Sequence, residues 1–192
     1  AETASRARDG AAGVSRALRG QALVYLDTVR PTQARSLLEE ALRLADGMPD
    51  REARARLLEL LAENKLNLGK PEDAEALRRE AEALREDAPT EDTLGIRVKL
   101  RTGRLAEARR ALETSAAAEQ RAADSGLIRP PRAHRETALL SSLVDAFMGQ
   151  SVQAAAAAQA GIELGERLES PFIIAVGRMR LGHALQLLPS DR

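Results

Sequence analysis

Cysteine and tryptophan are absent from this 192-residue sequence, and its aromatic residues are Tyr25, Phe147 and Phe172 alone. Without cysteine the sequence offers no disulfide, no thiolate nucleophile and no zinc–thiolate site. Because aromatic residues are so few, the core must be built mainly from Leu and Ala, which favour helices over strands. The composition therefore predicts an all-α protein.

An excess of one charge sign is also missing. The sequence contains 29 Lys and Arg residues and 29 Asp and Glu residues, so its formal net charge is +0. Proteins that bind nucleic acids normally carry a basic excess, because contacts with phosphates need cations. We therefore expect no direct contact with nucleic acid.

Long apolar segments are absent as well. No run approaches the roughly 20 apolar residues of a membrane helix. Residues 1–20 are rich in Arg and contain no apolar segment, unlike a signal peptide. Together with the missing cysteine, these features predict a cytoplasmic protein without membrane contact.

A short turn sequence recurs along the chain. In three copies a Gly lies five residues before an Ala, and in a fourth, residues 29–34, the Gly has been lost. The three pairs are Gly69 with Ala74, Gly103 with Ala108, and Gly149 with Ala154. A Gly just past a helix end can adopt the left-handed conformation that satisfies the last carbonyls. The recurring turn therefore predicts repeated helix pairs.

Small residues recur on one face of the helix after each turn, at positions i, i+4 and i+7. The four sets are Ala34, Leu38 and Ala41; Ala74, Arg78 and Ala81; Ala108, Leu112 and Ser115; and Ala154, Ala158 and Gly161. Such a face allows two helices to approach closely. We expect nine helices, at residues 5–27, 31–46, 50–68, 71–86, 90–102, 105–124, 132–148, 151–168 and 171–188. Ser151 and Ser170 are the expected N-caps of the last two helices.

A first helix, a Gly turn and an Ala-rich second helix resemble the tetratricopeptide repeat, and residues 18–20 and 181–182 are similar to its Leu-Gly signature. The sequence departs from that family by lacking its Trp, and by placing Ile96 and Ser142 where the family has a small Gly. The resemblance implies an all-α, right-handed superhelical solenoid of antiparallel helix pairs. We expect residues 1–192 to form a single repeat domain.

The repeat is longer than in that family. The Ala after each turn recurs about every 40 residues between Ala34 and Ala154, whereas tetratricopeptide repeats have about 34. The longer repeat and residues 160–184 resemble the helical-repeat region of MalT-type regulators, which are bacterial LuxR-family transcription activators. That resemblance implies an effector-binding segment between an ATPase module and a DNA-binding module. We accordingly expect a fragment of a longer bacterial protein.

Residues typical of a catalytic or metal site are not combined in this sequence. Its two histidines, His134 and His183, lie in different repeats without Cys or paired carboxylates nearby, and no hydrolase, zinc-protease or phosphate-loop motif is present. The carboxylates alternate with Arg, which is typical of ion pairs on helix surfaces. We interpret the Arg clusters in residues 51–56 and 129–135 as solvated faces rather than anion sites. We therefore predict no enzyme activity, no cofactor and no metal.

The first helices of tetratricopeptide repeats line a concave ligand surface, so the resemblance implies a groove for a ligand or partner. We map residues onto this groove by their offset from the repeat Ala or from the Leu-Gly position. The predicted groove residues are Gln21, Tyr25, Glu59, Glu63, Arg97, Arg101, Glu136, Phe147, Met179, His183 and Gln186.

Two functions remain open at this point. The chain is either the effector- or protein-binding segment of a transcription regulator, or a stand-alone interaction module that captures a peptide or partner helix. The scarcity of aromatic rings argues against a sugar ligand. The last helix lacks a following partner, and we expect Phe172, Ile173, Ile174 and Val176 on its exposed side. An end-to-end dimer through helix 171–188 is therefore a further alternative.

Overall fold

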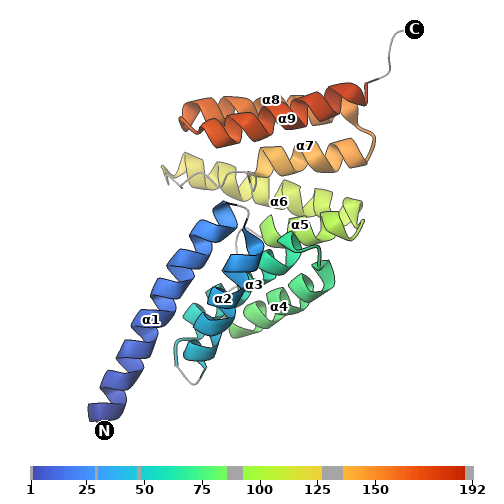
Figure 1. The fold of residues 1–192 in the computed structure, drawn as a ribbon. Helices are drawn as coiled ribbons and strands as arrows, with labels where there is room; N and C mark the ends of the chain where they lie inside the picture. Colours follow the sequence, from blue (N-terminus) through green and yellow to red (C-terminus); the bar gives the residue numbers. More distant parts are fainter. Residues whose placement is uncertain (1, 29, 47–48, 86–92, 127–135, 189–192) are drawn as a thin grey trace. The chain divides into compact units, whose positions relative to one another are not determined.

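The computed structural model describes residues 2–28, 30–46, 49–85, 93–126 and 136–188, with side chains from residue 10 onward. The secondary structure of these residues consists of nine α-helices, which confirms the predicted all-α helical-repeat architecture. The chain forms two compact units, residues 1–89 and residues 90–192. Each unit is described by itself (Figure 1).

The first unit contains two helix pairs. Its helices are α1 (Glu2–Asp27), α2 (Pro31–Ala45), α3 (Arg51–Asn67) and α4 (Pro71–Leu84). Each helix packs against the next one, and α1 also contacts α3. Proline begins both α2 and α4, because a residue without an N–H suits the first helical turn. At the start of α3, the Asp50 side chain accepts a hydrogen bond from the Ala53 N–H at 2.8 Å.

Leu and Ala side chains form the core of the first unit. The predicted small face of α2, Ala34, Leu38 and Ala41, is completely buried, and it packs with Leu26 of α1 and Leu57 of α3. Burying one Leu side chain contributes about 1.5–3 kcal/mol. The core of this unit therefore comes from the repeat pattern that the sequence shows.

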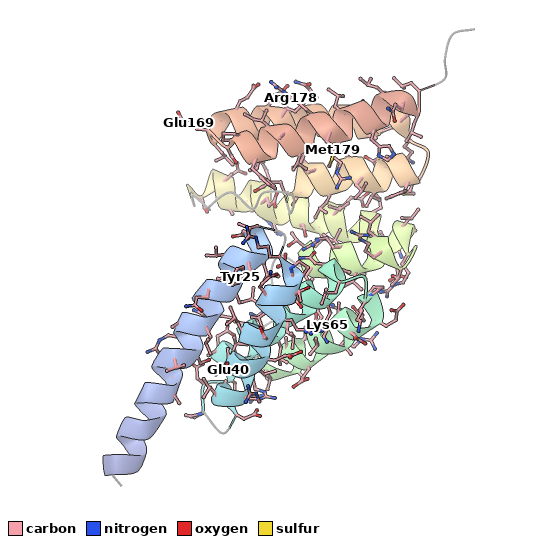
Figure 2. All side chains as sticks on the ribbon, viewed as in Figure 1. Tyr25, Glu40, Lys65, Glu169, Arg178 and Met179 are labelled. Atoms are coloured by element: carbon pink, nitrogen blue, oxygen red, sulfur yellow. The ribbon has the colours of Figure 1, made fainter. Side chains whose placement is uncertain are left out.

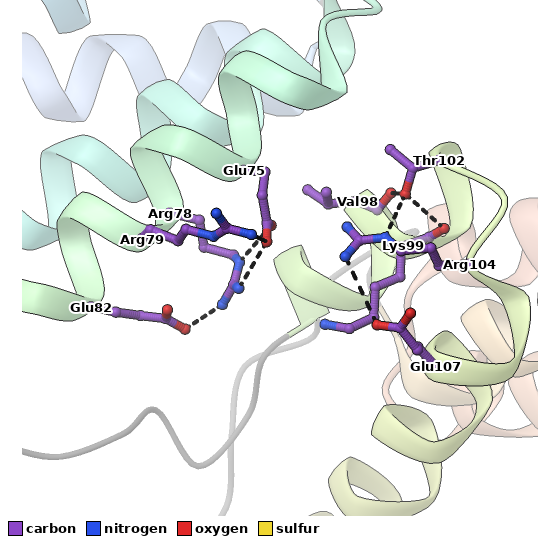
Figure 3. Close-up of polar contacts among 9 residues, drawn as sticks. All are labelled: Glu75, Arg78, Arg79, Glu82, Val98, Lys99, Thr102, Arg104 and Glu107. Carbon is purple, nitrogen blue, oxygen red and sulfur yellow. Dashed lines mark hydrogen bonds and ion pairs between the residues drawn. The ribbon is translucent and has the colours of Figure 1, made fainter.

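Arg78 occupies the middle position of the small face of α4. Its guanidinium forms ion pairs with Glu75 and Glu82 on the same helix (Figure 3), while Ala74 and Ala81 on either side are completely buried. The long aliphatic part of an Arg side chain can cover apolar surface while its charged end stays paired. The predicted face is thus kept although its central residue is charged.

The second unit contains five helices. They are α5 (Thr93–Arg101), α6 (Leu105–Asp124), α7 (Thr137–Phe147), α8 (Ser151–Arg167) and α9 (Pro171–Gln186). Consecutive helices pack together, and α7 also contacts α5 and α9. The small faces of α6 and α8 are buried, as predicted. The predicted helices 90–102 and 132–148 start within residues 86–92 and 127–135, which lie outside the described part of the chain.

Three glycines bring α7, α8 and α9 close together. A Cβ added at Gly161 would collide with the Leu139 side chain of α7. One added at Gly165 would lie 2.9 Å from the backbone N of Ile174 in α9, and one at Gly177 would lie 3.1 Å from that of Ile162 in α8. Because backbone atoms cannot move aside as a side chain can, these helices need Gly at their crossing points.

The predicted Gly turns are present at three sites. Gly69, Gly103 and Gly149 have φ values of +76°, +73° and +75°. In the first of them, the Gly69 N–H donates to the Leu66 carbonyl and the Lys70 N–H to the Lys65 carbonyl, at 3.1 and 2.9 Å. This is the Schellman pattern, in which left-handed Gly satisfies the last carbonyls of a helix.

Two details differ from the sequence-based expectations. Ser151 is not an N-cap, because Gln150 occupies the cap position of α8 and makes no side-chain cap bond, whereas Ser170 does cap α9 as predicted. Ile173 is completely buried rather than exposed, since it packs beside Gly165 of α8. Of the other three apolar residues that we expected on the exposed side of this helix, Phe172 is exposed, and Ile174 and Val176 are half-buried.

Candidate functional site

The helices are divided into two sets, according to whether they come first or second in a helix pair. We call α1, α3, α5, α7 and α9 the first helices and α2, α4, α6 and α8 the second helices. In the second unit α7 contacts both α5 and α9, and Figure 1 shows α7 next to α9. We call the surface that these three helices share the first-helix face of the second unit.

The predicted groove residues of the first unit differ in accessibility. Gln21 is exposed, Tyr25 is half-buried and packs against the core, and Glu63 is buried. Glu59 is half-buried and forms an ion pair with Arg85, at the end of α4. These four residues therefore do not form one open surface.

Arg85 joins the two helices of this pair through carboxylates. It contacts Glu59 and also Glu52, at 3.2 Å. Hydrogen bonds from Arg56 and then Arg85 hold the pKa of Glu52 below its ordinary value. Burial lowers the pKa of Arg85, but the bonds to Glu59 and Glu52 outweigh it and raise that pKa overall. We interpret Glu59 as part of a structural ion-pair network between α3 and α4.

The predicted groove residues of the second unit fall into two classes. Arg97 and Glu136 are buried. The others are exposed or half-buried, and they are Arg101, Phe147, Met179, His183 and Gln186. Buried side chains cannot meet a ligand on the surface, so the accessible set is the one that a partner could contact.

Phe147 and His183 form a contact between α7 and α9. Their ring centroids are 6.3 Å apart and their planes are inclined by 72°, which is an edge-to-face arrangement. Phe147 keeps 57% of its surface exposed. An exposed aromatic side chain held in place by a neighbouring ring is a typical anchor for a partner's apolar side chain.

Arg101 and Arg180 place two positive charges on the same face. Burial lowers the pKa of Arg180, and the charge of Arg101 lowers it further, so the two guanidiniums lie near enough to repel. Arg180 lies one turn from His183 on α9, and Arg101 of α5 corresponds to Phe147 of α7, since each lies two residues before a turn Gly. Within the described part of the chain, neither Arg has an ion-pair partner.

Charges are segregated between the two sets of helices in the second unit. Helix α5 contains Arg97, Lys99 and Arg101, and α9 contains Arg178, Arg180 and His183; neither contains Asp or Glu. The second helices α6 and α8 carry most of this unit's described carboxylates. The first helices α5 and α9 of this unit are thus cationic, although the chain has no net charge.

The single acidic residue of α7 points away from this cationic face. Asp145 is buried and forms an ion pair with Arg109 of α6. Arg109 also donates to the Gln150 side chain at 3.0 Å, and the Ser141 hydroxyl lies 3.4 Å from the Asp145 carboxylate. The Asp145 charge is therefore neutralised from the second-helix side.

A second feature, a groove of about 890 Å³, lies among α6, α7 and α8. Ala is the commonest residue in its walls, and Arg109, Glu113 and Glu119 are among the charged side chains. None of the predicted groove residues lines it.

Metal binding and membrane crossing have no support among the described residues. No group of three or more His, Asp or Glu side chains among them could hold a metal ion, and His134 lies outside the described part. None of the described helices is both long and apolar enough to cross a membrane. The accessible residues of the first-helix face are therefore the strongest candidate site.

The comparison with protein families gives one match, to the tetratricopeptide repeat, over residues 13–87. This match supports tetratricopeptide-like repeats in that segment. The matched segment spans most of the first unit, and the second unit has the same arrangement of helix pairs and Gly turns. Comparisons with curated proteins and with solved structures found no match. Tetratricopeptide repeats are generally binding or scaffold elements rather than catalytic ones.

Sequence reasoning missed Arg180. The mapping by offset selected Met179 and His183 on this helix, one residue before and three residues after it. The signal that could have found it is the complete absence of acidic residues from α9, because an Arg on such a helix must find its counter-charge elsewhere.

Proposed function

We propose that this protein is a non-catalytic interaction module that binds a peptide or a helix of a partner protein on the first-helix face of the second unit. The tetratricopeptide match supports a binding or scaffold role. The carrying observation is the exposed Phe147 ring, held edge-to-face by His183 between two first helices.

An unbiased peptide selection tests this proposal. The full chain would be immobilised and challenged with a phage-displayed peptide library, and the selected peptides would be titrated against it by calorimetry. We expect Phe147→Ala to weaken binding by about tenfold or more, because an anchoring aromatic side chain typically contributes 1–2 kcal/mol or more.

Val152→Ala is the matched control for Phe147→Ala. Val152 is an apolar residue on the second helix α8 with 67% of its surface exposed, so its loss should leave affinity unchanged. If the library yields no peptide that binds saturably, the interaction function is wrong. If the two variants lose affinity equally, the first-helix face is not the binding surface.

The resemblance to MalT-type regulators receives no support from the comparisons. A role as the effector-binding segment of a bacterial cytoplasmic regulator, or an end-to-end dimer through α9, therefore stays a prediction. Flanking gene sequence encoding an ATPase and a DNA-binding module would support the regulator assignment, and their absence would exclude it.

A further inference from the structure

We infer that a small cavity in the first unit binds a free amino acid or a similar small zwitterion. Two side chains of α1, Arg16 and Arg19, bind the carboxylate of the ligand. The carboxylate of Asp50, at the start of α3, binds its ammonium group. This site is separate from the proposed partner-binding face, which lies in the second unit.

The cavity has a volume of about 300 Å³ and lies where α1, the end of α2 and the start of α3 meet. Its buried lining residues are Ser15, Ala45 and Leu57, and the Ser15 hydroxyl donates to the Ala41 carbonyl of α2 at 3.0 Å. This volume is at the lower end of the range for small-molecule sites. A partner helix, about 10 Å across, is too thick for it, so the cavity suits a small ligand.

The unpaired cations of the cavity are on α1. Arg16 and Arg19 both line it, and residues three apart on a helix are neighbours. Within the part of the chain that the structure describes, neither guanidinium forms a hydrogen bond or an ion pair. Two neighbouring guanidiniums without a counter-charge can bind one carboxylate through charge-assisted hydrogen bonds.

A third guanidinium of the cavity, that of Arg56 on α3, is already paired. It contacts Glu52 at 2.8 Å, and Glu52 also contacts Arg85 at 3.2 Å. The charge of Glu52 is therefore balanced by two guanidiniums, and neither Arg56 nor Glu52 is left to hold a ligand.

Asp50 supplies the unpaired negative charge. Its Oδ1 atom accepts the Ala53 N–H at 2.8 Å and caps α3, and its other oxygen has no partner among the described residues. A carboxylate oxygen accepts hydrogen bonds from an ammonium group. A ligand with a negative charge alone would be repelled by Asp50, and one with a positive charge alone would be repelled by the two Arg side chains. The cavity therefore matches a molecule that carries both charges.

The cavity is distinct from the groove that the repeat resemblance implies. None of the predicted groove residues lines it. Of those on α1, Tyr25 lies near the end of the helix that leads into α2 (Figure 2), whereas Arg16 and Arg19 lie nearer the middle of the helix. The apolar part of a bound amino acid would contact Leu57, so an aliphatic side chain suits the cavity.

Isothermal titration calorimetry of the full chain with three matched probes tests the site. The first probe, L-leucine, carries both charges and an aliphatic side chain. Isocaproate is the same molecule without the ammonium group, and isoamylamine is the same molecule without the carboxylate. We expect saturable binding of leucine that weakens as NaCl is raised, and binding at least about tenfold weaker for each of the other two probes.

Arg19→Gln and Asp50→Asn should each weaken leucine binding about fivefold or more, because each removes a charge that holds the ligand. Asn caps a helix as well as Asp does, so Asp50→Asn keeps the start of α3. Arg35→Gln is the matched control and should bind leucine as the unmodified chain does, since Arg35 is exposed on α2 and does not line the cavity. Circular dichroism checks the fold of each variant, and Arg16→Gln, at an exposed position, replaces Arg19→Gln if that variant unfolds.

Three results would overturn the site. They are the absence of saturable leucine binding, equal binding of leucine and either analogue, and equal effects of Arg35→Gln and Arg19→Gln. Tighter binding of inorganic phosphate than of leucine would show a plain anion site and would also overturn the zwitterion site. Library-selected peptides should bind the Arg19→Gln variant as they bind the unmodified chain, so this site and the proposed interaction function can fail independently.

Discussion

Glu169 ends helix α8 in the left-handed conformation that glycine adopts at the other turns of this protein. It has φ +49°, and its N–H donates to the Glu166 carbonyl while the Ser170 N–H donates to the Gly165 carbonyl. The same pair of bonds closes the turns at Gly69, Gly103 and Gly149. A residue with a Cβ is strained in this conformation by about 1–2 kcal/mol.

We expect Glu169→Gly to raise the free energy of unfolding by up to about 1 kcal/mol, because relief of strain outweighs the extra entropy of glycine in the unfolded chain. Chemical denaturation followed by circular dichroism measures the change. Gly103→Ala, at φ +73°, is the reverse experiment and should lower stability by about 1 kcal/mol. A destabilised Glu169→Gly variant would show that the Glu169 side chain makes a contact that outweighs the strain.

Helix α9 contains two glycines with different surroundings, and only one of them faces α8 closely. Gly177 and Gly182 both lie within α9. A Cβ at Gly177 would meet the Ile162 backbone, whereas a Cβ at Gly182 would meet nothing within 4 Å. Glycine in a helix costs roughly 0.5–1 kcal/mol relative to Ala, so the outcome of substitution depends on the neighbour.

We therefore expect Gly177→Ala and Gly182→Ala to change stability in opposite directions. Gly182→Ala should stabilise by about 0.5–1 kcal/mol, while Gly177→Ala should destabilise by about 1–3 kcal/mol because α8 and α9 must separate. Thermal unfolding of the two variants makes the comparison. A stabilising Gly177→Ala would mean that the two helices do not cross as closely as the structure shows.

At the scale of the whole molecule, each compact unit has its own hydrophobic core. Among the described residues, two clusters draw their side chains from α1 to α4, and two others draw theirs from α5 to α9. Leu58 belongs to the first set and Leu140 to the second. Both are almost completely buried.

Hydrogen exchange of the full chain can test whether stability follows these clusters. Leu58→Ala should cost about 2–5 kcal/mol and should lower amide protection mainly in α1 to α4. Leu140→Ala is the matched variant and should lower protection mainly in α5 to α9. Equal loss of protection along the entire chain, from either variant, would contradict this expectation.

Helix content, turn positions and the buried small faces followed from local sequence patterns. Gly69, Gly103 and Gly149 mark helix ends through backbone conformation, and the Ala and Leu spacing sets the buried side of each second helix. These features need information from a few neighbouring residues only. Such features can be predicted from a sequence alone, and the structure confirms them.

The candidate site could be predicted only in part, because it depends on which helices meet. The offset mapping selected Phe147 and His183, but it also selected Arg97 and Glu136, which neighbouring helices bury. Arg180 was missed, although its position near Arg101 makes the face cationic. The periodicity of a helix tells which side chains share a side, whereas burial, ring contact and unpaired charge arise from residues distant in sequence and come only from packing.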